Sequence, residues 1–380
     1  MYDFLKGVRV LDLTAVVLGP FATQYLGDFG ADVIKVEPPA GDIFRNVGPA
    51  RSAGMGAGFL NLNRNKRSVC LDLKKEPDRA RFSALLDEAD VLVHNMRPTA
   101  AKRLGLDPDE VMKSYPHLVY CIAAGYGSRG RRADRPAYDD IIQAASGIAA
   151  LNSGEKGEPR FLPSILCDKI GGLHLALAVL AGIVRQAKTG RGCSIEAPMF
   201  EGLVSFLMAE HLSGQTFRPA RGEIGYDRIT SPHRRPFATK DGHISVLPYN
   251  GRHWIDFLQC VGRADLVEVD WVKDAAKRSS RINELYAIVA DAMPERTTGE
   301  WLQVLGDLDV PCSPVNTLDD LLNDPHLQDV GLFEDINHPS EGDLRSIRTP
   351  FWVNGAHRER DMPAPAKPVA DETVSWRARA

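Results

Sequence analysis

The first two hundred residues of this chain alternate short apolar runs, rich in β-branched side chains, with segments whose apolar residues recur at helical spacing. This alternation is typical of a parallel β-sheet joined by crossover helices. The runs are almost continuously apolar, which indicates strands that are buried on both faces of the sheet. We therefore predict an α/β fold, with strands at residues 8–14, 31–38, 68–73, 90–95 and 118–124.

A long apolar helix is predicted from about residue 170 to residue 188, followed by a short strand in the sequence CSIEAP. Its longest uncharged run, residues 170–184, is shorter than the ~20 residues that a membrane-spanning helix needs. The N-terminal segment mixes charges among its apolar residues, unlike a secretory leader. These features predict a cytoplasmic protein with no membrane partner.

The charges are nearly balanced, with 46 basic and 50 acidic side chains among 380 residues. This balance gives no global field for nucleic acid or anionic lipid, so a phosphate group would need a local cluster of cations. The chain is long enough to bury a large core, which we expect to be split between two domains. The six cysteines are scattered without a C-x-x-C pair, so we expect reduced thiols and no metal site.

The sequence changes character after residue 218. Residues 218–250 are basic and rich in turn formers, and the Asp241-Gly242 pair in FATKDGHISVLP predicts the turn of a β-hairpin. Helical segments continue from residue 254 to residue 322. The tail from residue 324 is rich in Pro, Gly and His, and we expect it to pack back over a part of the chain that is already folded.

The sequence GYGSRG, residues 125–130, matches the dinucleotide-binding pattern G-x-G-x-x-G and follows a predicted strand. That pattern requires an apolar helix directly after the third glycine, because the helix N-terminus binds the pyrophosphate. Here the polar sequence RRADRPAYDD follows, interrupted by Pro136. A dehydrogenase is therefore the weakest of the functions considered.

Asp168 directly precedes the predicted long helix, and its position allows two interpretations. An aspartate before an apolar helix is a favoured N-cap, and capping is the ordinary role of such a residue. With Gly171 and Gly172 allowing a backbone or a ligand to approach, the same position also suits an ionised, accessible nucleophile. Attack of this carboxylate on a thioester would give a mixed anhydride that a thiolate could open again.

Basic residues gather in the loops that follow the predicted strands. Taken singly, such residues are ordinarily solvated surface charges. Taken together, they fall where an open α/β sheet has its ligand crevice, so they are also candidates for binding a phosphorylated ligand. They are Arg45, Arg64, Lys66, Arg67, Lys74, Lys75, Arg97, Lys102 and Arg103.

Several segments, in order along the chain, strongly resemble the class III CoA-transferases of the CaiB/BaiF type. These are GVRVLDLTAVVLGPFATQYLGDFGADVIKVEPPAGDIFRNVGP, FLNLNRNKRSVCLDLK, ADVLVHNMRP, RLGLD, and the Asp168 segment that runs to AKTGRGCSIEAPMFEG. The resemblance covers nearly all of residues 7–202. The DGHISV hairpin, the Trp254 segment and DPHLQDVGLF continue it more loosely.

The resemblance implies a Rossmann-like large domain with a parallel sheet at residues 1–200, without the dinucleotide fingerprint. A linker at 201–225 would lead to a smaller α+β domain at 226–325, and residues 326–380 would return to the large domain. In this family two chains thread through one another as interlocked rings. An intertwined homodimer is therefore expected.

The resemblance also assigns site residues. The family nucleophile falls on Asp168, and Tyr138 and Asp139 match the segment that borders the acyl group. The positions that match the CoA contacts are Val16, Leu18, Leu71, Lys74, Asn95, Met96, Arg97, Arg103 and Met199.

The mechanism that the resemblance implies moves CoA between an acyl-CoA donor and a carboxylic acid acceptor. Asp168 would attack the donor to form an aspartyl anhydride, and the CoA thiolate would then form an aspartyl-CoA thioester. Thioester and anhydride are both activated acyl groups, so the task of the enzyme is to exclude water and hold oxyanions, for which amides near Gly171 or from the second chain are candidates. We expect no permanently bound cofactor, with coenzyme A entering as substrate.

Departures from the family pattern leave alternatives open. The same fold hosts acyl-CoA racemases, which need two acid/base groups and carry a histidine where this chain has Tyr138. The tyrosine favours a transferase, with a racemase or isomerase as the alternative and a non-catalytic CoA-binding protein as a third. The glycine-rich loop of formyl- and oxalate-type members is not evident, which argues against those substrates or for a different lid.

Overall fold

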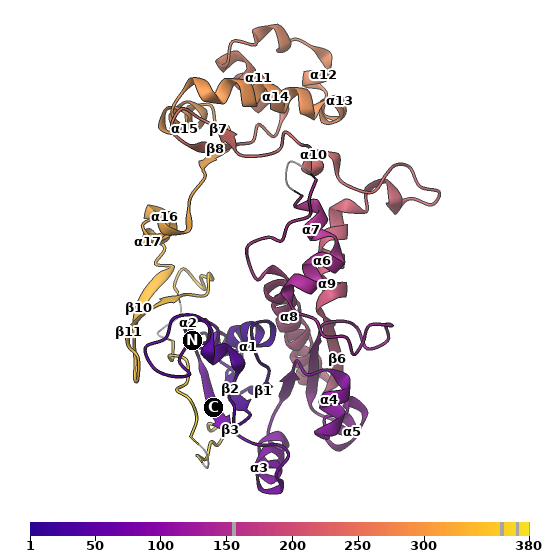
Figure 1. The fold of residues 1–380 in the computed structure, drawn as a ribbon, viewed down its shortest axis with the longest axis vertical. Coiled ribbons are helices and arrows are strands. Elements are labelled where there is room, and N and C mark those ends of the chain that lie inside the picture. The colour runs from indigo at the N-terminus through magenta and orange to yellow at the C-terminus, as the bar shows by residue number, and fades with distance from the viewer. Residues whose placement is uncertain (154–156, 358–360, 370–371, 380) are drawn as a thin grey trace. The chain divides into compact units, whose positions relative to one another are not determined.

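The computed structural model describes residues 1–153, 157–357, 361–369 and 372–379, which form two compact units (Figure 1). The first unit comprises Met1–Leu207 together with Gln328–Ala380. The second comprises Met208–Leu327. The chain thus leaves the first unit once and returns to it.

Six parallel strands form one sheet among the described residues of the first unit, in the order β3-β2-β1-β4-β5-β6. The predicted α/β class is confirmed, and each predicted strand is present within a few residues of its expected bounds. The strands are β1 (Arg9–Leu13), β2 (Asp32–Glu37), β3 (Lys66–Cys70), β4 (Val91–His94), β5 (Val119–Ala124) and β6 (Cys193–Pro198).

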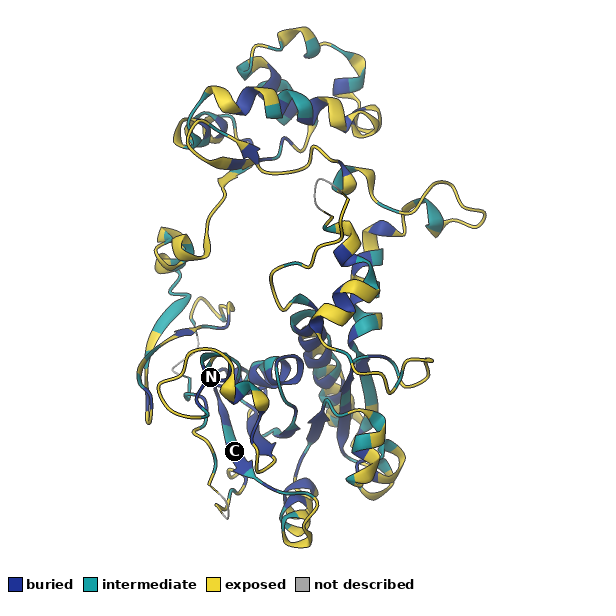
Figure 2. Cartoon of the chain, in the orientation of Figure 1, coloured by how far each residue is buried: buried dark blue, intermediate teal, exposed yellow. Residues whose placement is uncertain are grey.

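The sheet is covered on both faces, which explains its apolar strands. Successive residues of a strand point to opposite faces. Val10 of β1 therefore joins the core formed with α1 (Leu18–Asp28) and α8 (Leu166–Thr189), whereas Leu11 joins the core formed with α3 (Glu76–Asp87). Both side chains are fully buried, and Figure 2 shows the central strands of the sheet largely in the colour of buried residues.

The other helices of the first unit are short, and they connect the strands or precede α8. They are η1 (Ile43–Asn46), α2 (Ala57–Leu62), α4 (Pro98–Arg103), α5 (Pro108–Ser114), α6 (Asp139–Ser146) and α7 (Ile148–Leu151). The helix α9 (Met199–His211) follows β6 and ends in the second unit.

The helix α8 begins four residues before its predicted start. By length and composition it could cross a membrane, since the helix has 24 residues and extends beyond the uncharged run at residues 170–184. One face packs against α1, β5 and β6, with Leu175 and Val179 fully buried. Packing in the core of the first unit therefore accounts for much of its apolar character.

The C-terminal tail lies against the sheet unit. After the hairpin of β10 (Phe333–His338) and β11 (Gly342–Ile347), the chain runs along the first unit without regular structure in its described part. Trp376 is buried with the α3 side of the core, and its indole Nε1 donates to the carbonyl of Leu85 at 2.9 Å.

The second unit has its own core. The strands β7 (Phe237–Ala238), β8 (His243–Val246) and β9 (Cys312–Pro314) form an antiparallel sheet, and the predicted hairpin with Asp241-Gly242 at its turn is confirmed. Trp254, Tyr286 and Trp301 fill the core. The helices of this unit and its boundary are η2 (Ser213–Thr216), α10 (Asp227–Thr230), α11 (Gly251–Cys260), η3 (Ala264–Leu266), α12 (Asp270–Lys273), α13 (Ala275–Ser280), α14 (Ile282–Ala292), η4 (Met293–Glu295), α15 (Thr298–Asp307), α16 (Leu318–Leu322) and α17 (Pro325–Asp329).

Candidate active site

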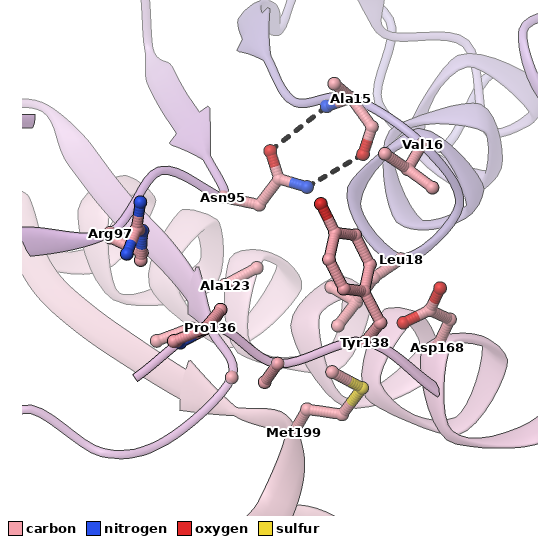
Figure 3. Close-up of a pocket in the computed structure, with 13 residues that line it drawn as sticks. Ala15, Val16, Leu18, Asn95, Arg97, Ala123, Pro136, Tyr138, Asp168 and Met199 are labelled. Carbon is pink, nitrogen blue, oxygen red and sulfur yellow. Dashed lines mark hydrogen bonds between the residues drawn. The ribbon is translucent and has the colours of Figure 1, made fainter. Parts of the chain in front are cut away.

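A cavity of about 300 Å³ opens at the carboxyl ends of β1, β4 and β5 (Figure 3). The strand order reverses between β1 and β4, and open α/β sheets bind their ligands at such a point. The residues that line the cavity are Ala15, Val16, Leu18, Asn95, Arg97, Ala123, Ala124, Gly125, Pro136, Ala137, Tyr138, Asp168 and Met199.

The structure brings most of the predicted site residues to this one cavity. They come from segments far apart in the sequence: the turn after β1, the end of β4, the segment before α6, the start of α8 and the start of α9. The predicted residues that line the cavity are Val16, Leu18, Asn95, Arg97, Tyr138, Asp168 and Met199.

Four predicted CoA contacts lie elsewhere in the described structure. Leu71 is buried in the core on the α3 side of the sheet, and Lys74 is exposed in the turn before α3. Met96 and Arg103 line a second, more apolar cavity beside α4. The chain is extended after β4, so Asn95 and Arg97 face the first cavity while Met96 between them faces the second.

Asp168 is not the N-cap of α8. The helix begins at Leu166, so Asp168 is its third residue, and Ile165 in the cap position makes no side-chain capping bond. The capping interpretation is therefore wrong. Asp139 provides the cap instead, because its Oδ1 accepts the backbone N–H groups of Cys167 at 2.6 Å and Asp168 at 3.1 Å.

Asp139 is itself fixed by its neighbours. It is the first residue of α6, it is buried, and its Oδ2 accepts a hydrogen bond from Gln143 Nε2 at 2.7 Å. The other end of the Gln143 amide accepts the backbone N–H of Leu162. The segment before α8, the start of α6 and the nucleophile candidate are thus joined by one set of hydrogen bonds.

The carboxyl group of Asp168 is poorly solvated, with 7% of the residue exposed. Burial and, secondarily, the negative charge of Asp139 raise the pKa of Asp168 to about 7. The expectation of an ordinary ionised carboxylate is thereby corrected, since this pKa leaves a substantial fraction of Asp168 protonated at neutral pH. Strongly shifted carboxyl groups in a cavity are typical of functional sites.

The two glycines after Asp168 allow a backbone to approach, as predicted. A Cβ on Gly172 would lie 2.7 Å from the carbonyl oxygen of Leu18, and one on Gly171 would lie 2.9 Å from Leu18 Cδ1. The start of α1 is thus packed against the first turns of α8. Gly171 is the sixth residue of α8, beyond the amides that lack intrahelical acceptors, so its N–H is not a suitable oxyanion donor.

Most of the basic residues proposed for phosphate binding are engaged in ion pairs within the first unit. Arg45 pairs with Glu37 and Lys66 with Asp12, and all four side chains are almost completely buried. Arg64 pairs with Asp28, and Arg67 pairs with Asp32. The prediction that this group gathers around a phosphorylated ligand is wrong for these four cations. Arg97 lines the Asp168 cavity.

The glycine-rich loop at 125–130 does not form a dinucleotide site. No helix begins at its third glycine, since the next helix is α6. Its amides are taken by carboxylates: Gly127 N donates to Glu201 at 3.0 Å and Ser128 N donates to Glu196 at 2.7 Å. A pyrophosphate would find acidic side chains where it needs free N–H groups, which removes the structural basis for a dehydrogenase.

Sequence reasoning missed part of the cavity wall. Ala15 is the second residue after β1, and Ala123 and Ala124 end β5, so their places at the carboxyl ends of strands were the available signal. Pro136 and Ala137 carried no signal of their own. Within the described residues, no cluster of three or more His, Cys, Asp or Glu side chains could hold a metal ion.

The fold and the site together define an α/β protein in which a carboxyl group with a raised pKa lines a cavity. The cavity lies at the switch point of the sheet, where the strand order reverses between β1 and β4. The sequence pattern of CoA-transferase family III matches residues 5–368. The chain belongs to this family, and it is a transferase enzyme that uses CoA thioesters as substrates.

Relatives of this chain are named as CoA-transferases that act on different acids. Human succinyl-CoA:glutarate CoA-transferase is 32% identical over 344 residues, which cover 90% of this chain and 78% of the relative. Succinyl-CoA:mesaconate CoA-transferase of Haloarcula hispanica is 30% identical and covers 97% of this chain and 94% of the relative.

Solved structures of relatives have the same fold. The crystal structure of an aspartate-to-alanine variant of Rv3272 from Mycobacterium tuberculosis superposes with a TM-score of 0.83 at 30% identity and covers 96% of each chain. A CAIB/BAIF family protein from Brucella suis gives a TM-score of 0.79 at 27% identity, covering 96% of this chain and 97% of that one.

Proposed function

We propose that this CoA-transferase works through covalent intermediates on Asp168. The observation that carries the proposal is the position of Asp168, whose carboxyl group is buried at the wall of the switch-point cavity and has a pKa raised to about 7. A carboxylate that is stripped of water is a stronger base and nucleophile than one in solution.

The reaction has four balanced steps. The Asp168 carboxylate attacks the thioester carbonyl of the donor, the C–S bond breaks, and CoA leaves as thiolate from an aspartyl anhydride. The thiolate attacks the Asp168 carbonyl, which forms an aspartyl-CoA thioester and releases the donor acid as carboxylate. The acceptor carboxylate then attacks this thioester, giving a second anhydride and the thiolate. Attack of the thiolate on the acceptor acyl carbon yields the new acyl-CoA and restores Asp168, with no net proton change.

Asp139 tunes and orients the nucleophile in this proposal. It caps the start of α8, so the two amide groups it binds are not available to stabilise the Asp168 anion. Its negative charge adds to the effect of burial on the pKa of Asp168. Tyr138, which is 61% exposed at the rim of the cavity, would border the acyl group.

A short dicarboxylic acid is the substrate class we propose. Relatives are named for succinyl-CoA with glutarate, mesaconate or malate, so succinyl-CoA is the donor to test first. Arg97 at the cavity wall supplies a cation for an anionic substrate group. Val16, Leu18, Asn95 and Met199 would bind the pantetheine end of CoA there, and Lys74, Met96 and Arg103 would contact the nucleotide end. The side chain of Leu71 is buried in the core, so only its backbone could take part in CoA binding.

The assembly and location are further parts of the proposal. Leu177 and Val184 on α8 and Phe206 on α9 are large apolar side chains that are more than half exposed, as an interlocked homodimer would require of an interface.

All six cysteines are free thiols, which fits the reducing cytoplasm.

Trapping with hydroxylamine tests the nucleophile. Incubation of the protein with succinyl-CoA and hydroxylamine should convert Asp168 to a hydroxamate, which peptide mass spectrometry would locate. Asp168→Ala should abolish both the label and CoA transfer, whereas the matched control Asp140→Asn, an exposed carboxylate on α6, should keep both. Exchange of an α-deuterium without any label on Asp168 would identify a racemase instead, and CoA binding with neither activity would identify a binding protein.

A further inference from the structure

The turn between β1 and α1 contains a residue in an unfavourable backbone conformation. Val16 has φ = 72°, in the left-handed region that β-branched residues rarely adopt. Such a conformation persists only where surrounding contacts hold it, and it is concentrated at functional sites. Ala15 and Val16 both line the Asp168 cavity, so the turn forms part of its wall.

Side chains from three other segments hold this turn by its backbone. Asn95 forms two hydrogen bonds with Ala15, accepting its N–H at 3.0 Å and donating to its carbonyl at 2.7 Å, as Figure 3 shows. Asp42 Oδ1 accepts the N–H of Val16 at 3.1 Å. Lys35 Nζ donates to the carbonyl of Thr14 at 2.6 Å.

Lys35 and Asp42 form a buried ion pair behind the turn. Their charged atoms lie 2.9 Å apart, and both side chains are almost completely inaccessible to solvent. Asp42 Oδ1 also accepts the N–H of Phe44 at 2.9 Å, which fixes the carboxylate. Replacement of a buried ion pair by apolar residues is often neutral or favourable for stability, so fold stability alone does not explain the pair.

The turn is connected to the nucleophile by close packing. Leu18 follows it directly, and the Leu18 carbonyl and side chain occupy the space left by Gly172 and Gly171 on α8. These glycines lie one turn of helix after Asp168. A change in the Val16 turn therefore moves a surface that contacts α8 as well as the cavity wall itself.

We propose that Lys35 and Asp42 are positioning residues for the transfer reaction. Neither is among the described residues that line the cavity. They act through the backbone of Thr14 and Val16, holding the left-handed turn and thereby the wall that faces the acyl-CoA. The inference rests on the proposed function only in placing the acyl-CoA in this cavity. Misplacement of a site by about 1 Å can reduce a rate about a hundredfold, which sets the scale of the expected effect.

The test removes the ion pair without leaving a lone buried charge. The double variant Lys35→Met/Asp42→Ala should keep a cooperative unfolding transition and lose about tenfold to a hundredfold in kcat/KM for CoA transfer, given the cost of misplacement. Arg67→Met/Asp32→Ala is the control, since it removes a pair at the opposite, amino ends of β2 and β3. The control should keep near wild-type kcat/KM.

Val16→Gly separates positioning from a merely structural role. Glycine adopts positive φ without strain, so a turn with glycine at this position needs less external support. The loss caused by the double variant should therefore be at least about threefold smaller in the Val16→Gly background than in the wild-type background, a departure from additivity that marks coupled residues. Equal losses in both backgrounds, or no loss with Val16 present, would overturn the proposal.

Hydrogen exchange provides a readout that needs no catalysis. The amide of Val16, which is bound to Asp42, should exchange at least about tenfold faster in the double variant, while amides in β5 should be unchanged. If wild-type protein forms no hydroxamate, the nucleophile assignment fails but this measurement still decides whether the pair holds the turn. Unchanged exchange at Val16 would reject the positioning role even where Asp168 is labelled.

Discussion

Asp12 and Asp168 are both buried carboxylic acids of the first unit, but their surroundings shift the two pKa values in opposite directions. Asp12 lies at the end of β1 beside two lysines, with Lys66 Nζ at 3.2 Å. Burial acts to raise its pKa, but Lys66, Lys35 and the hydroxyl groups of Thr14 and Thr23 outweigh it, and the pKa of Asp12 falls to about 2. Burial of Asp168 is accompanied by Asp139 instead, and the pKa of Asp168 rises to about 7.

The contrast shows that the same side chain is given a different chemistry by its partners. Around Asp12, lysine side chains and hydroxyl donors surround the carboxylate and keep it ionised. At Asp168, for which we propose a nucleophilic role, the carboxyl group has a second acid nearby, and its anion is destabilised. Three experiments break or sharpen this contrast.

Removal of the Asp12 partner should have the largest effect. Lys66→Met leaves the buried Asp12 short of a cation and removes a donor from Pro20 and Asn63, so it should lower the free energy of unfolding by about 3–5 kcal/mol. Urea denaturation at pH 7 measures the loss. Adding Asp12→Asn should recover part of it, because the buried charge is then absent. A loss as small as that of the exposed control Arg281→Ala would contradict the contrast.

Removal of the Asp168 charge should stabilise the protein. Its carboxyl group binds a proton more tightly in the folded chain than at its ordinary pKa of 3.8, so stability falls as pH rises between 3.8 and about 7. Asp168→Asn should therefore raise the free energy of unfolding by up to about 4 kcal/mol at pH 8 and by clearly less at pH 5. Thermal unfolding at both pH values tests this, with Asp140→Asn as control. An equal gain at both pH values would show that charge is not the cause.

Removal of the Asp139 charge should have the smallest effect. Asp139→Asn keeps an oxygen to accept the amides of Cys167 and Asp168 but removes the charge that raises the pKa of Asp168. It also loses the hydrogen bond that Asp139 Oδ2 accepts from Gln143 Nε2. The acid limb of the pH profile of kcat/KM should move to lower pH. With a pKa of about 7, Asp168 is ionised in about one-tenth of the wild-type enzyme at pH 6. The ratio of kcat/KM at pH 6 to its plateau value can therefore increase at most about tenfold in the variant. A limb that stays in place or moves to higher pH would exclude this role for Asp139.

The sheet could be predicted from the sequence because buried parallel strands have a local signature. Most of the six strands lie in short, mainly apolar runs, although β3 (KRSVC) and β6 (CSIEAP) carry several polar residues. The face of the sheet to which each side chain points follows from its position along the strand. Part of the cavity wall could be predicted for the same reason, since Asn95 and Arg97 are the first and third residues after β4. The resemblance to the family supplied the role of Asp168, which spacing alone left undecided between a cap and a nucleophile.

The electrostatics of the site could not be predicted, because they depend on pairs that are distant in sequence. Lys66 and Asp12 are 54 residues apart, and nothing in either segment indicates that they meet. The cap of α8 comes from Asp139, 29 residues before Asp168, which is why a helix that starts at Leu166 was predicted to start later. Partners of this kind are fixed by tertiary structure, and so are the pKa values that follow from them.

The place of Trp376 has a consequence for how the chain is made. Its indole ring completes the core beside Leu85, 291 residues earlier, and the whole of Met208–Leu327 is translated between the two parts of the first unit. Domains otherwise tend to form in order as they leave the ribosome. Here the amino-terminal sheet emerges first, but the side chain of Trp376 can join its core only after the whole intervening unit has been translated.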